Sequence, residues 1–175
     1  MRKKIFLGMD GGGTHTRVAA VDVDGNILSY VEKGGASFVK DLNAKDNICE
    51  AVCEAVYKAG STLSDVQGLV AGIAGLDREE DYIRARDLTN IDGLVGTKVH
   101  VNDAVIAHAG VFLSKPGIIA ISGTGSIVFG ITESRKQVRN YDFHHYAFTA
   151  ARHLSYETVY RIIAGEFGAS DRELV

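Results

Sequence analysis

The sequence predicts an α/β domain with a mixed sheet, in the order β-β-β-α-β-α-β-α, followed by the start of a second unit. Three observations predict this fold class. Short apolar or alternating segments open the chain, an amphipathic helical pattern follows them, and strand-like and helix-like segments then alternate. With 175 residues, 46% of them hydrophobic, the chain is long enough for one good core or two small domains.

The first three strands are expected between residue 3 and about residue 33. The segments "KKIFLGMD", "TRVAAVDV" and "NILSYVEKG" are apolar or alternating, and they are separated by "GGGTH" and by Asp24-Gly25. An Asp-Gly pair between alternating segments favours a tight hairpin. The three strands should therefore be antiparallel.

Residues 42–59 show the period of an amphipathic helix. Apolar residues recur every three or four positions on one face, while Glu50, Glu54 and Lys58 lie opposite. The apolar face consists of Ile48, Val52, Ala55, Val56 and Ala59. This pattern predicts a helix that is closed by Gly60.

Later segments alternate between strand and helix patterns. "VQGLVAGIAG" is a buried strand, and Asp77 is expected to cap a helix to about Leu88, with Glu80 three residues on. "TKVHVND", "GIIAISGTGS" and "IVFGITE" are further strands, and "AVIAHAGVFL" is a short helix. A helical pattern then runs from about Phe143 to Ala164.

The fresh start near Pro116 places a first domain at residues 1–115 and a second at 116–175. The tail "GASDRELV" carries a capping box, Ser170 to Glu173, at a point where a helix should begin. We therefore expect the chain to stop before its second domain is complete.

Composition narrows the class of protein. The net charge is −3 and no basic run is present, which argues against a nucleic-acid partner. Apolar runs are far shorter than the ~20 residues that span a bilayer, and that of "MRKKIFLGMD" is too short for a signal peptide. We therefore expect a cytoplasmic protein that does not enter the membrane.

Three glycines follow Asp10 and a threonine closes the run. Glycine weakens a strand, so the run needs either positive φ or close approach to bare backbone. Backbone N–H groups in such a turn can bind an anion, and an aspartate beside phosphates requires a divalent cation, usually Mg²⁺. Gly11, Gly12, Gly13 and Thr14 thus fit a nucleotide-phosphate turn with Asp10 positioning Mg²⁺, and a plain glycine hairpin is the alternative.

A second turn has the same form. In "AISGTGSIVFG", an apolar strand leads into Gly123, Thr124, Gly125 and Ser126 and then into another apolar strand. Two such hairpins, each opening an α/β unit, indicate two related halves that clamp one polyphosphate.

Four segments carry a resemblance to a known family: "GMDGGGTHTRVAAVD", "AGIAGLD", "VNDAVIAHAG" and "ISGTGSI", in this order. With them the chain resembles N-acetylglucosamine kinase-like proteins of the BadF/BadG/BcrA/BcrD ATPase type, in the sugar kinase, heat-shock ATPase and actin superfamily. The resemblance implies an actin-like, ribonuclease H-like fold of two domains that bind ATP and Mg²⁺. It assigns Asp10, Thr14 and Thr124 to the phosphate and metal site.

The resemblance also gives "VHVNDA" a role. In the family's kinases the aspartate of this motif contacts the sugar hydroxyl and acts as base, which implies Asp103 as the base. Asn102 beside it is a second candidate substrate residue, and its side chain can orient Asp103. A carboxylate at a strand end can accept the proton while the hydroxyl attacks the γ-phosphate. Both residues also suit a cap for the helix that starts at Ala104, and that alternative remains open.

Two segments depart from the family pattern. The family's sugar kinases usually carry an asparagine after the third strand, where this chain reads "GGASFVKD" and offers Ser37 as the substrate residue. The chain has no tryptophan, and "RNYDFHHYAFTAARHL" stands where the family shows Gly-Trp-Gly and then Gly-Asp-Glu-Gly. These departures predict either a different substrate or a lost site.

The sequence therefore predicts an ATP-dependent kinase that phosphorylates a hydroxyl of a small sugar or amino sugar, and it allows a homodimer. We expect little activity from these 175 residues alone. One alternative is an ATPase switch that activates a partner, for which Cys49 and Cys53 could hold an iron–sulfur cluster, although buried small residues fit these positions better. The other is a non-catalytic domain that binds nucleotide or sugar.

Overall fold

The structure is a computed structural model, and it describes residues 4–37, 41–123, 126–140, 150–166 and Gly168. Its contacts divide the chain into two compact units, Met1–Gly110 and Val111–Val175, which we describe in turn. The assignment of domains to residues 1–115 and 116–175 stays a prediction.

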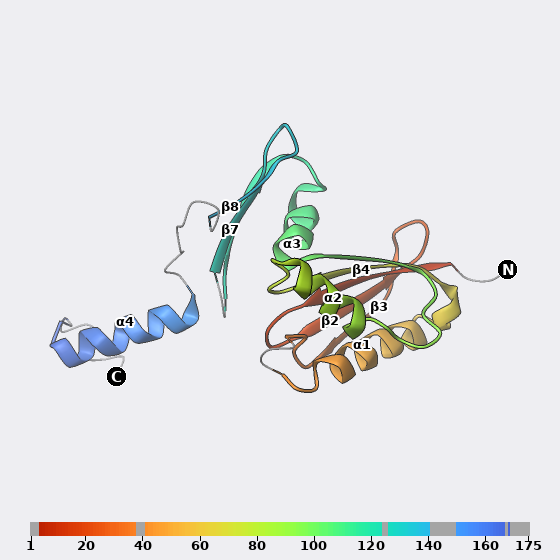
Figure 1. The fold of residues 1–175 in the computed structure, drawn as a ribbon, viewed down its shortest axis with the longest axis horizontal. Helices are drawn as coiled ribbons and strands as arrows, with labels where there is room; N and C mark the ends of the chain where they lie inside the picture. The colour runs from red at the N-terminus through yellow and green to blue at the C-terminus, as the bar shows by residue number, and fades with distance from the viewer. Residues whose placement is uncertain (1–3, 38–40, 124–125, 141–149, 167, 169–175) are drawn as a thin grey trace. The chain divides into compact units, whose positions relative to one another are not determined.

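The first unit alternates strands and helices in the predicted order (Figure 1). Its elements are β1 (Ile5–Gly11), β2 (Thr16–Val21), β3 (Ile27–Lys33), α1 (Ala44–Lys58), the 3₁₀ turn η1 (Leu63–Asp65), β4 (Val66–Ile73), α2 (Glu79–Leu88), β5 (Thr97–Asn102) and all but the last two residues of α3 (Asp103–Phe112). The short turn η1 was not predicted, because three residues carry no periodic pattern.

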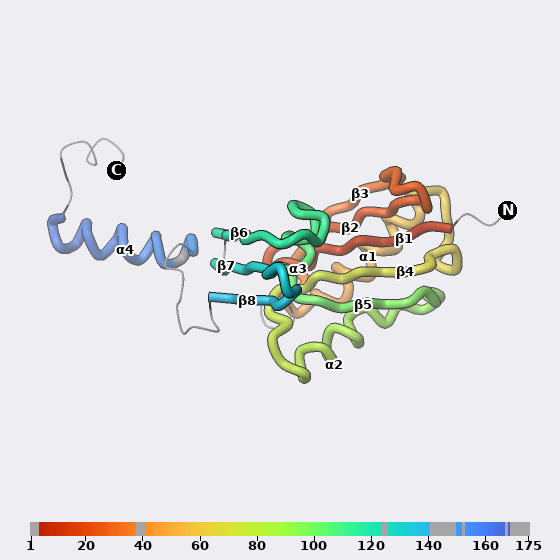
Figure 2. The backbone as a smooth tube through the Cα atoms, turned by 90° about the horizontal axis from the view of Figure 1, so that it is seen from above, coloured from red at the N-terminus to blue at the C-terminus, as the bar shows by residue number. Residues whose placement is uncertain are grey.

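The five strands form one mixed sheet in the order β3-β2-β1-β4-β5 (Figure 2). β1, β2 and β3 pair antiparallel, whereas β4 is parallel to β1 and β5 is parallel to β4. Gly25 has a φ of +85°, as a tight Asp24-Gly25 turn requires, so the predicted antiparallel strands are confirmed. The predicted α/β class with a mixed sheet is confirmed as well.

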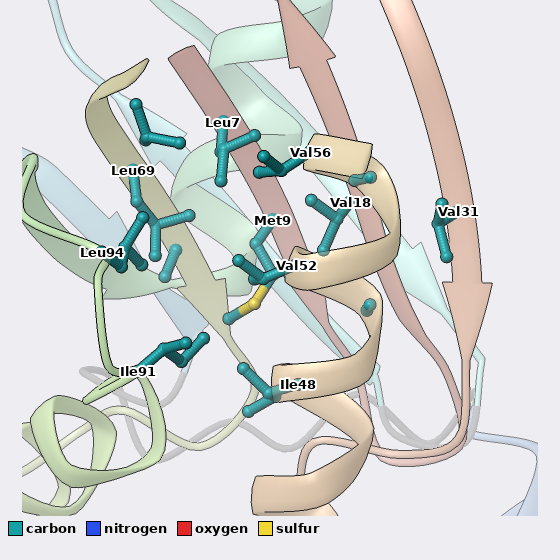
Figure 3. Close-up of a cluster of buried hydrophobic side chains, with 14 of the residues drawn as sticks. Leu7, Met9, Val18, Val31, Ile48, Val52, Val56, Leu69, Ile91 and Leu94 are labelled. Carbon is teal, nitrogen blue, oxygen red and sulfur yellow. The ribbon is translucent and has the colours of Figure 1, made fainter. Parts of the chain in front are cut away.

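The main core lies between this sheet and α1 (Figure 3). Burial alternates along β1, where Leu7 and Met9 are buried and Phe6 and Gly8 are exposed, so one face of the sheet is apolar and covered. The predicted apolar face of α1 is fully buried, and Figure 3 shows its Ile48, Val52 and Val56 pointing toward Met9 and Val18. The apolar face of α1 thus covers the buried face of β1 and β2.

α3 packs against the opposite face of the sheet. A Cβ atom added at Gly72 of β4 would lie 2.4 Å from the Cδ1 atom of Ile106 in α3. The small residues of "VAGIAGLD" therefore allow close packing of a helix on the sheet.

The second unit contains β6 (Gly117–Ser122), β7 (Ser126–Ile131), β8 (Gln137–Arg139) and α4 (Ala151–Ala164). Its three strands form an antiparallel sheet in the order β6-β7-β8. The predicted pair of strands is confirmed, and β8 is an addition whose three residues are too few to show alternation. The helix predicted from about Phe143 to Ala164 is confirmed from Ala151 onward as α4, while residues 143–149 and the predicted Ser170 to Glu173 box lie outside the described residues.

The expected cap of α2 is wrong. Arg78, rather than Asp77, is the residue before the first turn, and the carboxylate of Asp81 accepts hydrogen bonds from the N–H groups of Arg78 (3.0 Å) and Asp77 (3.4 Å). A carboxylate three residues inside a helix can satisfy the free N–H groups at its start, and Asp81 stands at that distance from Arg78, where Glu80 does not. In the part of the chain that the structure describes, every helix is too short or too polar to cross a bilayer.

Candidate active site

Three carboxylates gather where the parallel strands end. Asp10 is the next-to-last residue of β1, Asp77 follows β4, and Asp103 follows β5. Because β1, β4 and β5 are parallel neighbours, their carboxyl ends meet at one edge of the sheet, which is where α/β folds place ligand sites. The sequence predicted functional roles for Asp10 and Asp103, whereas it interpreted Asp77 only as a cap.

The charges of Asp10 and Asp77 act on Asp103. Burial raises the pKa of Asp103, the negative charges of Asp10 and Asp77 raise it further, and a hydrogen bond from the Ala104 N–H opposes both effects. A half-buried aspartate with a raised pKa at a strand end is a candidate for acid–base chemistry.

Asn102 and Asp103 together cap α3. The N–H of Ala104 donates to Oδ1 of Asn102 at 3.0 Å and to Oδ1 of Asp103 at 2.9 Å. The capping role left open by the sequence is therefore present. It engages only Oδ1 of Asp103, so it is compatible with a second role for Oδ2, and the catalytic role of Asp103 stays a prediction.

The glycine turn after β1 is held against its own chain. Neither Gly11 nor Gly12 has a positive φ, and a Cβ atom at Gly11 would lie 2.9 Å from the Cβ of Ala36. The N–H of Gly12 donates to the carbonyl of His15 at 2.8 Å, and the N–H of Ala36 donates to the carbonyl of Gly12 at 3.0 Å. The first glycine is therefore needed for packing against the loop after β3.

Hydrogen bonds within the turn show which of the predicted phosphate donors are already engaged. The N–H of Gly12 is already used within the turn, and a Cβ at Gly35 would lie 2.7 Å from the carbonyl oxygen of Gly13. Thr14, at the tip, is exposed. The donors best placed for an anion are thus the backbone N–H groups of Gly13 and Thr14 and the hydroxyl of Thr14.

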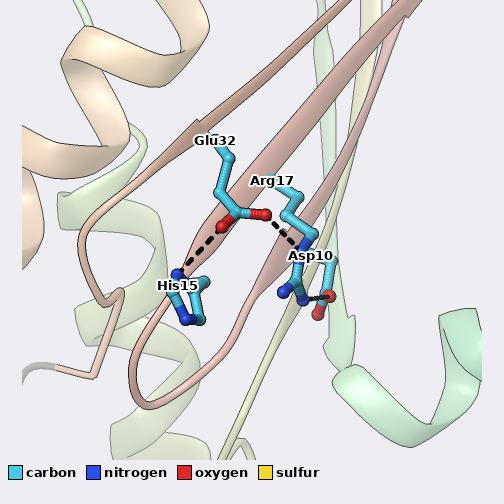
Figure 4. A network of polar contacts seen from close by, with 4 residues as sticks. All are labelled: Asp10, His15, Arg17 and Glu32. Atoms are coloured by element: carbon cyan, nitrogen blue, oxygen red, sulfur yellow. Dashed lines mark hydrogen bonds and ion pairs between the residues drawn. The ribbon is translucent and has the colours of Figure 1, made fainter.

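Asp10 is the first of a row of charged residues (Figure 4). The sequence did not predict this row. Arg17 donates from Nη1 to Oδ2 of Asp10 at 3.3 Å and from Nε to Oε2 of Glu32 at 2.8 Å. Nδ1 of His15 lies 3.1 Å from Oε1 of Glu32. The spacing of Asp10 and Arg17 around the glycine turn could have suggested the pair, once the two strands were assumed to form a hairpin.

The residues at this edge fit a magnesium ion that arrives with a nucleotide. Among the described residues, no three histidine, cysteine, aspartate or glutamate side chains converge to hold a metal alone. Mg²⁺ in nucleotide sites is usually bound by one or two carboxylates together with phosphates and water, so a protein cage is not needed. The half-exposed carboxylate of Asp10 supplies hard oxygen of that kind.

Other predicted residues occupy separate places. Ser37 lies in the loop after β3, next to Ala36, and is half-buried. Its backbone carbonyl accepts a hydrogen bond from the N–H of Asp41. In the second unit, Gly123 is exposed at the β6–β7 turn and its carbonyl accepts from the N–H of Ala151 at 2.9 Å. Ser126 pairs with Ser122 and is buried. Thr124 and Gly125 lie outside the described residues.

The two cysteines argue against the cluster alternative. Cys49 and Cys53 are both free thiols that pack against the core at the border of the buried face of α1. Burial raises the pKa of Cys53, and the neighbouring Cys49 raises it further. An iron–sulfur cluster needs accessible thiolates, so buried small residues are the better interpretation of this pair.

Two curated proteins are similar to this chain in sequence. The N-acetylmuramic acid/N-acetylglucosamine kinase of Clostridium acetobutylicum is 34% identical over 139 residues, which are 78% of this chain and 45% of that protein. The N-acetyl-D-glucosamine kinase of Dictyostelium discoideum is 32% identical over 142 residues, which are 74% of this chain and 44% of that protein. The chain thus spans about half the length of the curated relatives it matches.

Solved structures share the fold. A protein of Porphyromonas gingivalis that is provisionally named an N-acetylglucosamine kinase superposes with a TM-score of 0.73 at 19% identity, over 94% of this chain and 58% of that one. The expected actin-like ATPase fold is thereby confirmed. In sequence, the model of the BadF/BadG/BcrA/BcrD ATPase family matches residues 7–173. With most of its length matched in this way, the chain belongs to the BadF/BadG/BcrA/BcrD ATPase family.

Proposed function

We propose that the complete protein is an ATP-dependent kinase that phosphorylates a hydroxyl of a small sugar or amino sugar, with Asp103 as the base. The observation that carries this proposal is the position of Asp103, a half-buried carboxylate next to Asp10 at the ligand edge of the sheet. The names of the two curated relatives support a sugar as the substrate.

The chemistry requires one base and a site for phosphate charge. In its ionised form, Asp103 accepts the proton of the sugar hydroxyl through the oxygen that does not cap α3. The sugar oxygen then bonds to the γ-phosphorus, the bond from that phosphorus to the bridging oxygen breaks, and ADP leaves with the electron pair. The product is a sugar phosphate, and the proton stays on Asp103 until solvent removes it.

The glycine turn and Asp10 serve the phosphates in this proposal. The N–H groups of Gly13 and Thr14 and the Thr14 hydroxyl donate to phosphate oxygens, and Gly123 to Ser126 offer a second turn of the same kind. Mg²⁺, when bound with the nucleotide, would neutralise phosphate charge, and Asp10 would hold it, through a water molecule. Asn102, whose Oδ1 accepts from the same Ala104 N–H as Oδ1 of Asp103, orients that carboxylate, and Ser37 is the substrate contact offered by the loop after β3.

Sugar-dependent ADP release separates this function from an ATPase switch. The complete protein would be given ATP and Mg²⁺, with a panel of hexoses and N-acetylhexosamines added one at a time. The proposal expects one sugar to raise turnover sharply and to appear as its phosphate. Slow turnover that is indifferent to every sugar would reject the kinase and favour a switch that acts on a partner protein.

A further inference from the structure

Asp10, Arg17 and Glu32 form a straight row across three strands. Asp10 in β1 is paired with Arg17 in β2, and Arg17 is paired with Glu32 in β3. Directly opposed residues on one face of antiparallel strands lie next to each other, so the register itself brings the three side chains together. Their strand neighbours Met9 and Val18 face the buried core, so the row lies on the other face.

Glu32 fixes the orientation of Arg17. A guanidinium is planar and its N–H groups diverge at fixed angles, so a bond at Nε determines where the Nη groups point. The Nε bond to Glu32 (2.8 Å) is shorter than the Nη1 bond to Asp10 (3.3 Å). Glu32 is thus the anchor, and Arg17 presents its far edge to Asp10.

We propose that Arg17, anchored by Glu32, is a positioning residue that orients the Asp10 carboxylate for the metal–nucleotide complex. This inference rests on the proposed function, in which Asp10 serves Mg²⁺. Arg17 engages Oδ2 of Asp10, so Oδ1 is the oxygen left to accept from a metal-bound water. Glu32 balances the charge of Arg17, so the carboxylate is oriented without losing its attraction for a cation.

The simpler explanation is a surface ion-pair row with little effect. The side chains of Asp10, Arg17 and Glu32 are each about two-fifths exposed, at 42%, 42% and 41%, and exposed pairs usually contribute little to stability. The two explanations differ in sign. If only charge matters, Arg17→Gln leaves Glu32 uncompensated and tightens Mg²⁺ binding. If positioning matters, the same change weakens it.

Calorimetric titration of Mg²⁺ into the complete protein with a fixed concentration of ADP tests this difference. We expect Arg17→Gln to weaken the apparent Mg²⁺ affinity about tenfold, as loss of a hydrogen-bond partner of a metal-binding carboxylate commonly does, with ADP binding in chelator much less affected. The double variant Arg17→Gln/Glu32→Gln, whose net charge equals that of the wild type, should be as weak as Arg17→Gln. Arg86→Gln removes an exposed ion pair with Glu79 on α2 and is the control.

Three outcomes decide the matter. Tighter or unchanged Mg²⁺ binding in Arg17→Gln, or wild-type binding in the double variant, would overturn the positioning role. Asp10→Asn, measured alongside, distinguishes failure of the Arg17 role from failure of the metal role of Asp10. If Asp10→Asn abolishes the Mg²⁺ dependence and Arg17→Gln does not change it, only the inference on Arg17 fails. If Asp10→Asn has no effect, the proposed metal role of Asp10 fails too.

Glu32→Gln, which keeps Arg17 on the strand, should weaken binding in the same direction if Arg17→Gln cannot be purified.

Discussion

Gly11 and Ala36 lie so close together that a Cβ atom added at Gly11 would stand 2.9 Å from the Cβ of Ala36. A Cβ atom is fixed by the backbone that carries it, so neither atom can move away by side-chain rotation. The first glycine of the turn is therefore explained by packing within the protein, before any ligand is considered.

Gly11→Ala should accordingly destabilise the protein by about 1–3 kcal/mol, the usual cost of overpacking a buried site. Gly8→Ala on the same strand is the matched control, because no atom lies within 4 Å of its added Cβ. Urea unfolding of both variants measures the difference. Equal stability of the two would show that the loop after β3 moves freely away from the turn.

The contact between Gly72 and Ile106 predicts a coupled pair. An added Cβ at Gly72 would lie within 2.4 to 3.0 Å of three Ile106 side-chain carbons, so Gly72→Ala alone should be destabilising by roughly 1–3 kcal/mol. Ile106→Ala removes those carbons and leaves a gap, and the double variant should recover part of the loss. A double-mutant cycle measures this coupling, and strictly additive effects would contradict the contact.

The ion pairs of Glu54 should make the stability of the protein fall in acid. Lys33 and Lys58 each place Nζ 2.7 Å from a Glu54 oxygen, and these bonds lower the pKa of Glu54 from 4.5 to about 2. A lowered folded-state pKa means that the contribution is present above pH 4.5 and is lost as the pH falls toward 2. The stability advantage of wild type over Glu54→Gln should shrink across that window, whereas Glu50→Gln on the exposed face of α1 serves as the control. An advantage that is constant from pH 6 to pH 2 would contradict the assignment.

The raised pKa of Asp103 should make stability depend on pH in the opposite direction to Glu54. Because its pKa is raised in the folded protein, the stabilising contribution belongs to the protonated form and is lost as the pH rises through the folded-state pKa. Asn resembles the protonated form and keeps an oxygen for the Ala104 N–H. Asp103→Asn should therefore be at least as stable as wild type at pH 7, with the difference shrinking toward pH 3.8. A clear loss of stability at pH 7, larger than that of the exposed control Asp92→Asn, would argue that Asp103 is structural.

The sequence predicted elements better than it predicted side-chain pairs. Alternation in β1 to β3 and the periodic apolar face of α1 are local patterns, so they can be recognised without knowing the fold. The pairing of Asp10 with Arg17 depends on the register of β1 against β2, which the length of the turn sets and no local pattern reports. In "DREED" several carboxylates lie close together, so the sequence did not show that α2 begins after Arg78 and that Asp81 accepts the Arg78 N–H.

The candidate site shows the same division. Asp10 and Asp103 stand in motifs that a family resemblance can identify, whereas their electrostatic coupling arises because parallel strands from distant parts of the chain end side by side. Asp77 joins them for that reason alone. The glycines of the turn were predicted as phosphate donors, and that role stays a prediction. The structure shows that the Gly12 N–H is bonded within the turn, which no sequence pattern reports.

The most direct test of the account is sugar-dependent ADP release by Asp103→Asn in the complete protein, measured with the sugar that gives the highest turnover in wild type. Loss of a general base usually costs about 10²- to 10⁴-fold in rate, so we predict at least a hundredfold fall in kcat while sugar and nucleotide still bind. Asp92→Asn should retain wild-type turnover. A kcat for Asp103→Asn within about threefold of wild type would contradict the assignment of Asp103 as the base and, with it, the central claim.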